Sequence, residues 1–265
     1  MPNKEPSVTT GWSPFATRYP DLKRDRPRTD PVYGLCIHTS GGGVLTKAKK
    51  LGKHPDLVAL TYYQSATYST HYVAGLNGFY QLTSETERVM HIGAADEKRG
   101  RTAAQVRKWY LSGEWRKELP SSFIKRWDER WGSYDGVLNS PPLLYPTTYP
   151  NSCYVAIECI PCDGYTKSLQ KGARYTTAQH VWCALLACDM AERYDWPDGW
   201  FHSPRLATHE DLAPHNRITK GEGWDPGVLR KNPWFDWKFF QSWCIQGATL
   251  FKGKLGVMAE MARKV

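Results

Sequence analysis

The pattern of apolar and polar residues along the chain predicts short strands interleaved with helices. Apolar runs of strand length occur at 33–37, 70–76, 79–82 and 154–160. Apolar residues recur at helical spacing at 102–111, 121–131 and 175–194, and the segment 47–67 is helical or mixed. No internal repeat and no low-complexity linker separates these elements. One domain with an insertion and two extensions is therefore the simplest organisation.

Two short signals predict local structure within this pattern. Asn77-Gly78, between two strand runs, predicts a hairpin with a two-residue type I′ turn. Thr176 or Thr177 is expected to cap the last of these helices. His180 is expected to lie exposed on the same helix.

Glu158 is an acid in the middle of the strand 154–160. Side chains alternate along a strand, so Glu158 shares a face with Tyr154, Ala156 and Ile160. A glutamate is seldom buried without a partner, and burial raises its pKa, which suits a proton shuttle. The alternative is a structural role, in a salt bridge or at an exposed edge of the sheet.

Composition narrows the class of partner. The chain has 265 residues, 41% of them hydrophobic, with 12 Trp, a net charge of +9 and a pI near 9.1. It can form a sizeable core, and its charge favours an anionic partner such as nucleic acid, a membrane surface or a bacterial cell wall. No motif selects nucleic acid, and a basic surface that only aids solubility is the alternative. The tryptophans are either core residues or platforms for sugar rings.

Neither secretion nor membrane insertion is indicated. The first residues, MPNKEPSVTTGW, lack the apolar stretch of a signal peptide. No run of about 18 apolar residues is present, so no membrane span is expected. The 7 Cys have no regular spacing and indicate reduced residues in a protein made in the cytosol.

Residues of the types that bind metals gather in one late, loop-like segment. Between 205 and 227 lie His209, Asp211, His215 and Asp225. Far upstream, His38 directly follows a predicted strand and precedes a Gly-rich turn. A catalytic zinc site takes three protein ligands and keeps one position for water. We predict that His38, His209 and Asp225 hold one zinc ion, with His215 as a spare ligand and Asp211 bracing the loop.

Seven fragments of the chain occur in a recognisable order. They are Ile37-His38, Thr70-His-Tyr-Val73 with Asn77-Gly78 and Tyr80-Gln-Leu82, His91-Ile-Gly-Ala94, Val155-Ala-Ile-Glu158, Tyr175-Thr-Thr-Ala-Gln179, Thr208-His-Glu-Asp-Leu-Ala-Pro214 and Asp225-Pro-Gly227. In this order the chain resembles the type 2 N-acetylmuramoyl-L-alanine amidases, a zinc amidase superfamily that includes phage lysozyme-type amidases and peptidoglycan recognition proteins. The resemblance covers residues 30–95 and 150–240.

The resemblance implies an α/β (α+β) fold with a central mixed β-sheet flanked by helices. Residues 1–30 would form an N-terminal arm and residues 31–240 the zinc amidase domain, with a helical insertion at 96–150. Residues 241–265 would form a C-terminal extension for which a helix is one expectation. That extension either packs on the domain or forms a basic end facing a membrane.

The resemblance also assigns residues to the reaction. It matches the three predicted zinc ligands by position, and it makes Glu158 the catalytic acid and base. The family usually has a Lys two residues before the third ligand, where this chain has Gly223. Lys220 is therefore predicted as the assisting catalytic cation, with Arg217 as the alternative.

Three further residues are predicted to bind substrate. The resemblance places His91 at a cleft-lining His-x-Gly, and we group His71 with it. Thr39 joins them, at a position where the family often has a second His after the first ligand.

The implied activity is cleavage of the amide between N-acetylmuramic acid and L-alanine, with one Zn²⁺ per chain. A non-catalytic peptidoglycan-binding module and a zinc peptidase acting on stem peptides are the alternatives. The basic extensions and the lack of a signal peptide favour a phage endolysin, held in the host cytoplasm until lysis, or a virion-associated lysin, over a cytoplasmic wall-recycling enzyme. We expect a monomer whose partner is peptidoglycan and not nucleic acid.

Overall fold

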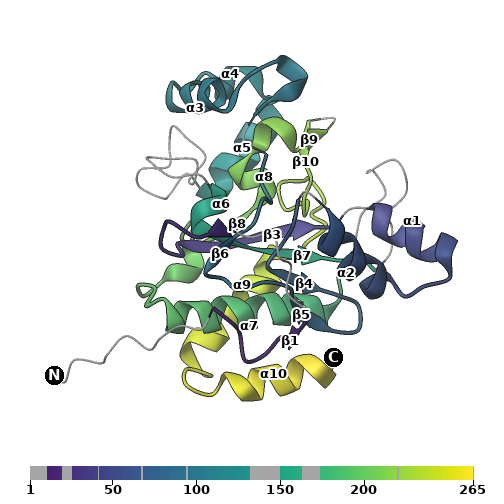
Figure 1. The fold of residues 1–265 in the computed structure, drawn as a ribbon. Coiled ribbons are helices and arrows are strands. Elements are labelled where there is room, and N and C mark those ends of the chain that lie inside the picture. The colour runs from purple at the N-terminus through teal and green to yellow at the C-terminus, as the bar shows by residue number, and fades with distance from the viewer. Residues whose placement is uncertain are drawn as a thin grey trace.

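The computed structural model describes residues 11–19, 26–40, 42–66, 68–93, 95–131, 150–162, 174–219 and 221–264. At its centre lies a six-stranded sheet in the order β1-β5-β4-β7-β3-β8 (Figure 1). These strands are β1 (Thr17–Arg18), β3 (Gly34–Thr39), β4 (Tyr72–Ala74), β5 (Phe79–Gln81), β7 (Tyr154–Cys159) and β8 (Leu206–Thr208). β4 and β5 are antiparallel, and the other neighbouring pairs are parallel. The predicted class, a central mixed sheet flanked by helices, is confirmed.

Helices and short ladders surround this sheet. The helices are α1 (Gly42–Leu51), α2 (Pro55–Ser65), α3 (Ala103–Leu111), α4 (Trp115–Glu118), α5 (Ser121–Trp131), α6 (Pro150–Cys153), α7 (Thr177–Arg193), α8 (His209–Leu212), α9 (Trp237–Thr249) and α10 (Leu255–Lys264). Short 3-10 turns are η1 (Glu97–Arg99), η2 (Trp200–His202) and η3 (Pro214–Asn216). Two-stranded ladders join β2 (Arg26–Pro27) to β6 (Glu87–Arg88) and β9 (Ile218–Thr219) to β10 (Glu222–Gly223). None of the described helices has the length and apolar character to cross a membrane.

The neighbouring strands β3 and β7 are buried along their whole length, as expected of parallel strands covered on both faces. Leu35 and Ile37 of β3 pack in the core that contains α7, whereas Cys36 packs in a separate cluster. Because side chains alternate along a strand, His38 lies on the same face as Cys36. Glu158 pairs directly with His38 across the ladder, so the sheet presents both side chains on the face away from α7.

Helix α7 begins directly after Thr176, the residue that caps it. The Thr176 hydroxyl accepts the Gln179 N–H at 3.1 Å, and the Gln179 side chain accepts the Thr176 N–H at 2.8 Å, which satisfies two otherwise unpaired groups. The expectation that His180 is exposed is wrong. Its ring packs 4.3 Å from the Phe235 ring, and its Nε2 accepts the Asp236 N–H at 3.1 Å. The chain after the late segment therefore covers this face of α7.

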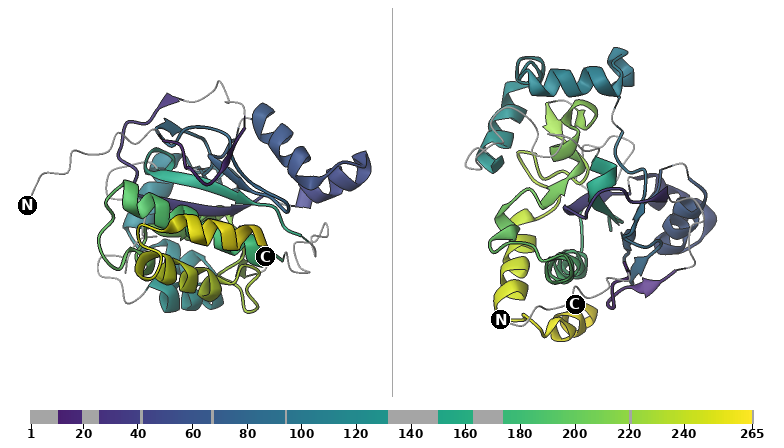
Figure 2. Two further views of the ribbon diagram at one scale, coloured as in Figure 1. Left: turned by 90° about the horizontal axis from the view of Figure 1, so that it is seen from below. Right: turned by 60° about the vertical axis from the view of Figure 1, so that its left-hand side comes forward.

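The C-terminal extension packs on the domain. Helices α9 and α10 lie against α7 (Figure 2), and Phe240, Leu255 and Met258 belong to the main core. This arrangement answers the question that the sequence left open, because both helices bury apolar side chains against the protein itself, while Val257 and Met261 of α10 stay exposed.

The insertion forms a helical layer at the opposite end of the molecule from α10 (Figures 1 and 2). It has an aromatic core formed by Trp109, Tyr110, Trp115, Phe123, Trp127 and Trp131. Leu229 and Ile218 join this core, so α3–α5 pack against the late segment. Residues 132–149 of the predicted insertion lie outside the described residues.

The predicted hairpin is formed by β4 and β5, but its turn is not the predicted one. Gly75 N–H donates to Gly78 O at 2.8 Å, so Leu76 and Asn77 make the turn. Neither has the positive φ that a type I′ turn requires. The cause is Asp56 of α2, whose carboxylate accepts the N–H groups of Leu76 at 2.7 Å and Asn77 at 3.0 Å. A tertiary contact, and not the Asn-Gly signal, sets this turn.

Candidate active site

The carboxyl ends of three neighbouring parallel strands bring the predicted site residues together. In the ladders, His38 of β3 lies opposite Glu158 of β7, and Ile37 lies opposite Thr208 of β8. His209, the residue after Thr208, begins α8 and so comes next to His38. The sheet register alone therefore places Glu158, His38 and His209 in a row.

Asp225 completes a set of three buried residues whose side chains can bind a metal. His38 Nδ1 lies 3.0 Å from His209 Nδ1 and 3.6 Å from Asp225 Oδ1, and His209 Nδ1 lies 3.0 Å from Asp225 Oδ2. Tetrahedral zinc ligands at about 2.1 Å from the metal are about 3.4 Å apart. Two imidazoles and a carboxylate at these separations fit zinc, and all three ligand atoms lie within 4.8 Å of one another.

Two members of this set, His209 and Asp225, have charge states that suit a cation. Burial and the nearby Arg217 lower the pKa of His209 well below its usual value, so its imidazole is neutral. Burial opposes ionisation of Asp225, but His209 and His38 outweigh it and hold the pKa of this carboxyl well below its usual value. The Asp225 backbone has φ 80°, a left-handed conformation that Asp tolerates better than most residues. The Thr39 N–H and the Arg217 Nε–H, at 2.7 and 2.9 Å, hold its carboxylate.

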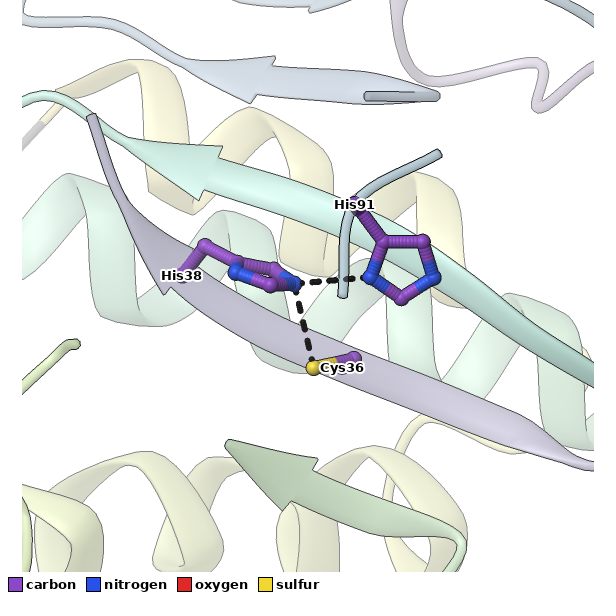
Figure 3. Close-up of side chains that lie close together, drawn as sticks. All are labelled: Cys36, His38 and His91. Atoms are coloured by element: carbon purple, nitrogen blue, oxygen red, sulfur yellow. Dashed lines mark hydrogen bonds between the residues drawn. The ribbon is translucent and has the colours of Figure 1, made fainter. Parts of the chain in front are cut away.

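His38 takes part in a second group of possible ligands on its other side. Its Nε2 lies 3.2 Å from Cys36 Sγ and 2.9 Å from His91 Nδ1 (Figure 3). Burial raises the pKa of Cys36, which keeps the thiol neutral, and Cys36 is fully enclosed. The group formed with His209 and Asp225 fits a catalytic metal better, because all three of its members border a cavity.

That cavity, the cleft, has a volume of about 760 Å³. Glu158 lines it together with the three ligand candidates, and so do Tyr63, His91 and Arg217. Burial raises the pKa of Glu158 to about 7, although the charge of His38 and a hydrogen bond from Tyr63 oppose the rise. Its Oε2 has no hydrogen-bond partner among the described residues. Glu158 can therefore exchange a proton near neutral pH beside the candidate metal site.

Comparison with known proteins gives one decisive match. The family model described as N-acetylmuramoyl-L-alanine amidase matches residues 28–228, which contain every residue of the cleft discussed so far. The chain belongs to this amidase family. A search of curated proteins found no match.

One solved structure is also similar. It is described as "crystal structure of Se-Met AmpD derivative", is 18% identical to this chain, and gives a TM-score of 0.45. The alignment covers 88% of this chain and 97% of that one.

Within the amidase domain, the departure at Gly223 has a physical cause. A Cβ atom at this position would lie 2.0 Å from Glu210 Oε2 and 3.1 Å from the Leu229 side chain. Glu210 is fully buried, and its Oε1 accepts the N–H groups of Val228 and, at 3.1 Å, Leu229. Burial raises the pKa of Glu210 to about 8. A lysine at 223 would displace the side chain that holds the loop after Asp225.

Arg217 brings a cation into the cleft. Besides its bond to Asp225, its Nη1 donates to the backbone and side-chain oxygens of Asn216, both at 3.2 Å. Its guanidinium stacks on Trp224, 4.7 Å from the ring centroid. The predicted catalytic Lys220 lies outside the described residues, and Arg217, the alternative, lines the cleft.

The two other candidate ligands of the late segment, Asp211 and His215, have structural partners. Asp211 caps α8 through Thr208 and accepts two hydrogen bonds from Arg130 and one from Trp131, which agrees with the predicted bracing role. His215 faces the insertion, where its Nδ1 lies 2.7 Å from the Tyr110 hydroxyl. It does not reach His38, and so it is no spare ligand.

The predicted substrate-binding residues divide into two groups. His91 and Thr39 line the cleft, and the Thr39 hydroxyl has no partner among the described residues. The prediction that His71 binds substrate is wrong, because His71 does not reach the cleft. It is fully buried, its Nδ1 accepts the Ala156 N–H at 3.0 Å, and its Nε2 lies 3.0 Å from an Arg28 nitrogen. His71 lies two residues before Val73, which pairs with Glu158. It is therefore on the same face of the sheet as Glu158, but further from the carboxyl ends of the strands, where the site lies.

Sequence reasoning missed two residues that shape the site. Tyr63 reaches Glu158 from α2, and Asn151 binds the backbone on both sides of His91. Tyr63 lies in a segment that the sequence left as helical or mixed, and Asn151 follows a Pro-rich loop. Neither position carries a local signal, because each acts only through a distant partner.

Proposed function

We propose that this chain is a zinc-dependent amidase that cleaves the bond between N-acetylmuramic acid and L-alanine in peptidoglycan. One observation carries the proposal: the His38, His209 and Asp225 group opens to the same cleft as Glu158, whose pKa is about 7. The amidase family of the chain supports the substrate class.

The ligands would be the two imidazoles, through Nδ1, and the Asp225 carboxylate. Bound zinc would polarise the scissile carbonyl and lower the pKa of water toward about 7. Asp225 supplies the negative charge of the set, and its contacts with Thr39 and Arg217 fix the carboxylate before a metal arrives. The position of these groups therefore does not depend on the substrate.

Glu158 would move the proton. Tyr63 holds the Glu158 carboxyl by a hydrogen bond, while Oε2 has no partner among the described residues. We propose that Glu158 accepts the proton of the attacking water and returns it to the leaving amine. A group with a pKa of about 7 can do both at neutral pH.

Arg217 would stabilise the negative charge that develops on the carbonyl oxygen. It lines the cleft, its side chain is 22% exposed, and the bond to Asp225 fixes its direction. A positioned cation of this kind lowers the barrier because it needs no reorganisation during the reaction.

We further propose that the protein is a phage endolysin or a virion-associated lysin that acts as a monomer. The net charge of +9 supports an anionic wall as the partner. Tests on living cells with and without a pore-forming partner would separate an endolysin, which needs one, from a virion lysin, which acts from outside.

Digestion of purified cell walls tests the reaction. The wild type should lower turbidity and release new L-alanine amino termini, and both should disappear in His209→Ala and after chelation, returning with added Zn²⁺. Mass spectrometry that finds cleavage within the stem peptide would instead identify a peptidase. Wall binding without any released fragment would identify a binding module.

A further inference from the structure

His91 lies between the metal group and the open cleft. Its Nδ1 is 2.9 Å from His38 Nε2 (Figure 3), and its Nε2 has no hydrogen-bond partner among the described residues. His91 is 6% exposed and lines the cleft. It thus contacts a ligand candidate on one side and the substrate space on the other.

A proton count fixes the tautomers of both rings. If His38 Nδ1 binds the metal, the only proton of its neutral ring is on Nε2. Two nitrogens 2.9 Å apart share one proton, so His91 Nδ1 must accept. The proton of His91 is then on Nε2, the nitrogen that lacks a partner.

We infer that His91 is a positioning residue for His38 and, through its Nε2–H, a hydrogen-bond donor to a carbonyl oxygen of the substrate. This inference rests on the proposed function, because it takes the metal to be on His38 Nδ1. The ring that accepts the His38 proton is thereby set as a donor at Nε2, a buried atom of a residue that lines the cleft.

The backbone of His91 is held for this task. The Asn151 Oδ1 accepts the N–H groups of His91 at 3.0 Å and Ile92 at 2.9 Å, and Asn151 Nδ2 donates to Ile92 O at 2.9 Å. Asn151 is itself 1% exposed. A side chain fixed in this way can orient a metal ligand, as second-layer partners of metal-bound histidines do.

Cys36 is the competing acceptor for the His38 proton, at 3.2 Å. A thiol sulfur is a weak acceptor, whereas an imidazole nitrogen is a strong one. The geometry therefore favours His91, and Cys36→Ala is the matched control.

Nitrogen NMR of the imidazoles tests the tautomers without turnover. In the zinc-loaded protein, His91 should show a protonated Nε2 and an unprotonated Nδ1, and His38 a protonated Nε2. A proton on His91 Nδ1 would overturn the inference.

Two substitutions separate the two roles. Asn at position 91 reproduces the Nδ1 acceptor but not the Nε2 donor, and Gln reproduces the donor but not the acceptor. His91→Gln should weaken zinc binding about 10- to 100-fold in chelator competition, whereas His91→Asn and Cys36→Ala should stay near the wild type. His91→Asn should instead raise KM for a soluble muramyl peptide, by about tenfold at most.

The outcomes distinguish this inference from the proposed function. Equal zinc affinity in His91→Gln and wild type, or a loss only in Cys36→Ala, would overturn the role of His91 while amide cleavage could still stand. The expected tautomers and affinities in a protein that cleaves no amide would support the role of His91 and remove the proposed reaction.

Discussion

At the scale of single residues, the chemistry depends on where burial leaves a group unpaired. Glu158 has one oxygen bound by Tyr63 and one without a described partner. Water cannot solvate its charge fully, and this raises its pKa to about 7. An exposed glutamate would be too weak a base to take a proton from water at neutral pH.

Glu158→Gln should therefore remove the proton shuttle and leave the metal group intact. We expect kcat to fall about 10²- to 10⁴-fold, because general acid–base catalysis contributes about this much. Release of amino termini measures kcat, and zinc per chain should stay at the wild-type value. Activity close to wild type in this variant would exclude Glu158 as the shuttle.

Arg217 makes a second prediction at this scale. Arg217→Ala should lower kcat about 10²- to 10³-fold, the usual effect of losing one group that stabilises the transition state. Arg217→Lys should recover part of this loss, because it keeps the charge but not the fork that binds Asp225 and Asn216. Steady-state kinetics on a soluble substrate would show this. A change in KM alone would argue for substrate binding only.

At the scale of elements, helix α5 braces the late segment. Arg130 of α5 binds both oxygens of Asp211 at 3.0 and 2.9 Å, and the Asp211 side chain is fully buried. Asp211 caps α8, which begins with His209. The insertion thus fastens the element that carries a predicted zinc ligand.

Arg130→Ala should destabilise the protein by about 3–5 kcal/mol, because it leaves the buried Asp211 charge without its cation. Urea unfolding measures this change. The control is Arg116→Ala, which breaks a pair with Asp128 whose side chains are 24% and 43% exposed and should cost at most about 1 kcal/mol. Equal losses in the two variants would show that α5 does not brace the late segment.

At the scale of the whole molecule, acid should unfold the chain through its buried histidines. Burial and the nearby Arg28 lower the pKa of His71 to about 3, whereas an unfolded histidine titrates near 6.5. Between these pH values the unfolded state binds one more proton. The His71 contribution is fully present above about pH 6.5 and falls by about 1.4 kcal/mol per pH unit down to about pH 3.

Unfolding free energies measured from pH 7 to pH 4 test this prediction. His71→Gln should show a shallower decline than the wild type, and KM should not change, because His71 does not reach the cleft. His202→Gln removes an exposed histidine and should keep the wild-type slope. If His71→Gln and the wild type decline in parallel, His71 is not the group responsible.

The sequence by itself determined the longer helices of the insertion and of 175–194, the strands that lead to His38 and carry Glu158, and the order of the chemistry along them. Helices α3, α5 and α7 begin and end close to their predicted bounds, because apolar spacing and the Thr102 and Thr176 caps are local signals. The pattern of strands 33–37 and 154–160 also indicated where His38 and Glu158 stand. These features depend on contacts within a few residues, which a sequence displays directly.

Only the tertiary structure decided which side chains meet. The register of β3 with β7 and β8 brings His38, Glu158 and His209 into one row. Glu210 excludes a side chain at position 223, and Arg217 brings a guanidinium to the cleft. The turn at Leu76 follows Asp56, and His71 lies outside the cleft. Each outcome rests on a contact between residues far apart in the chain, whose free energy no local pattern encodes.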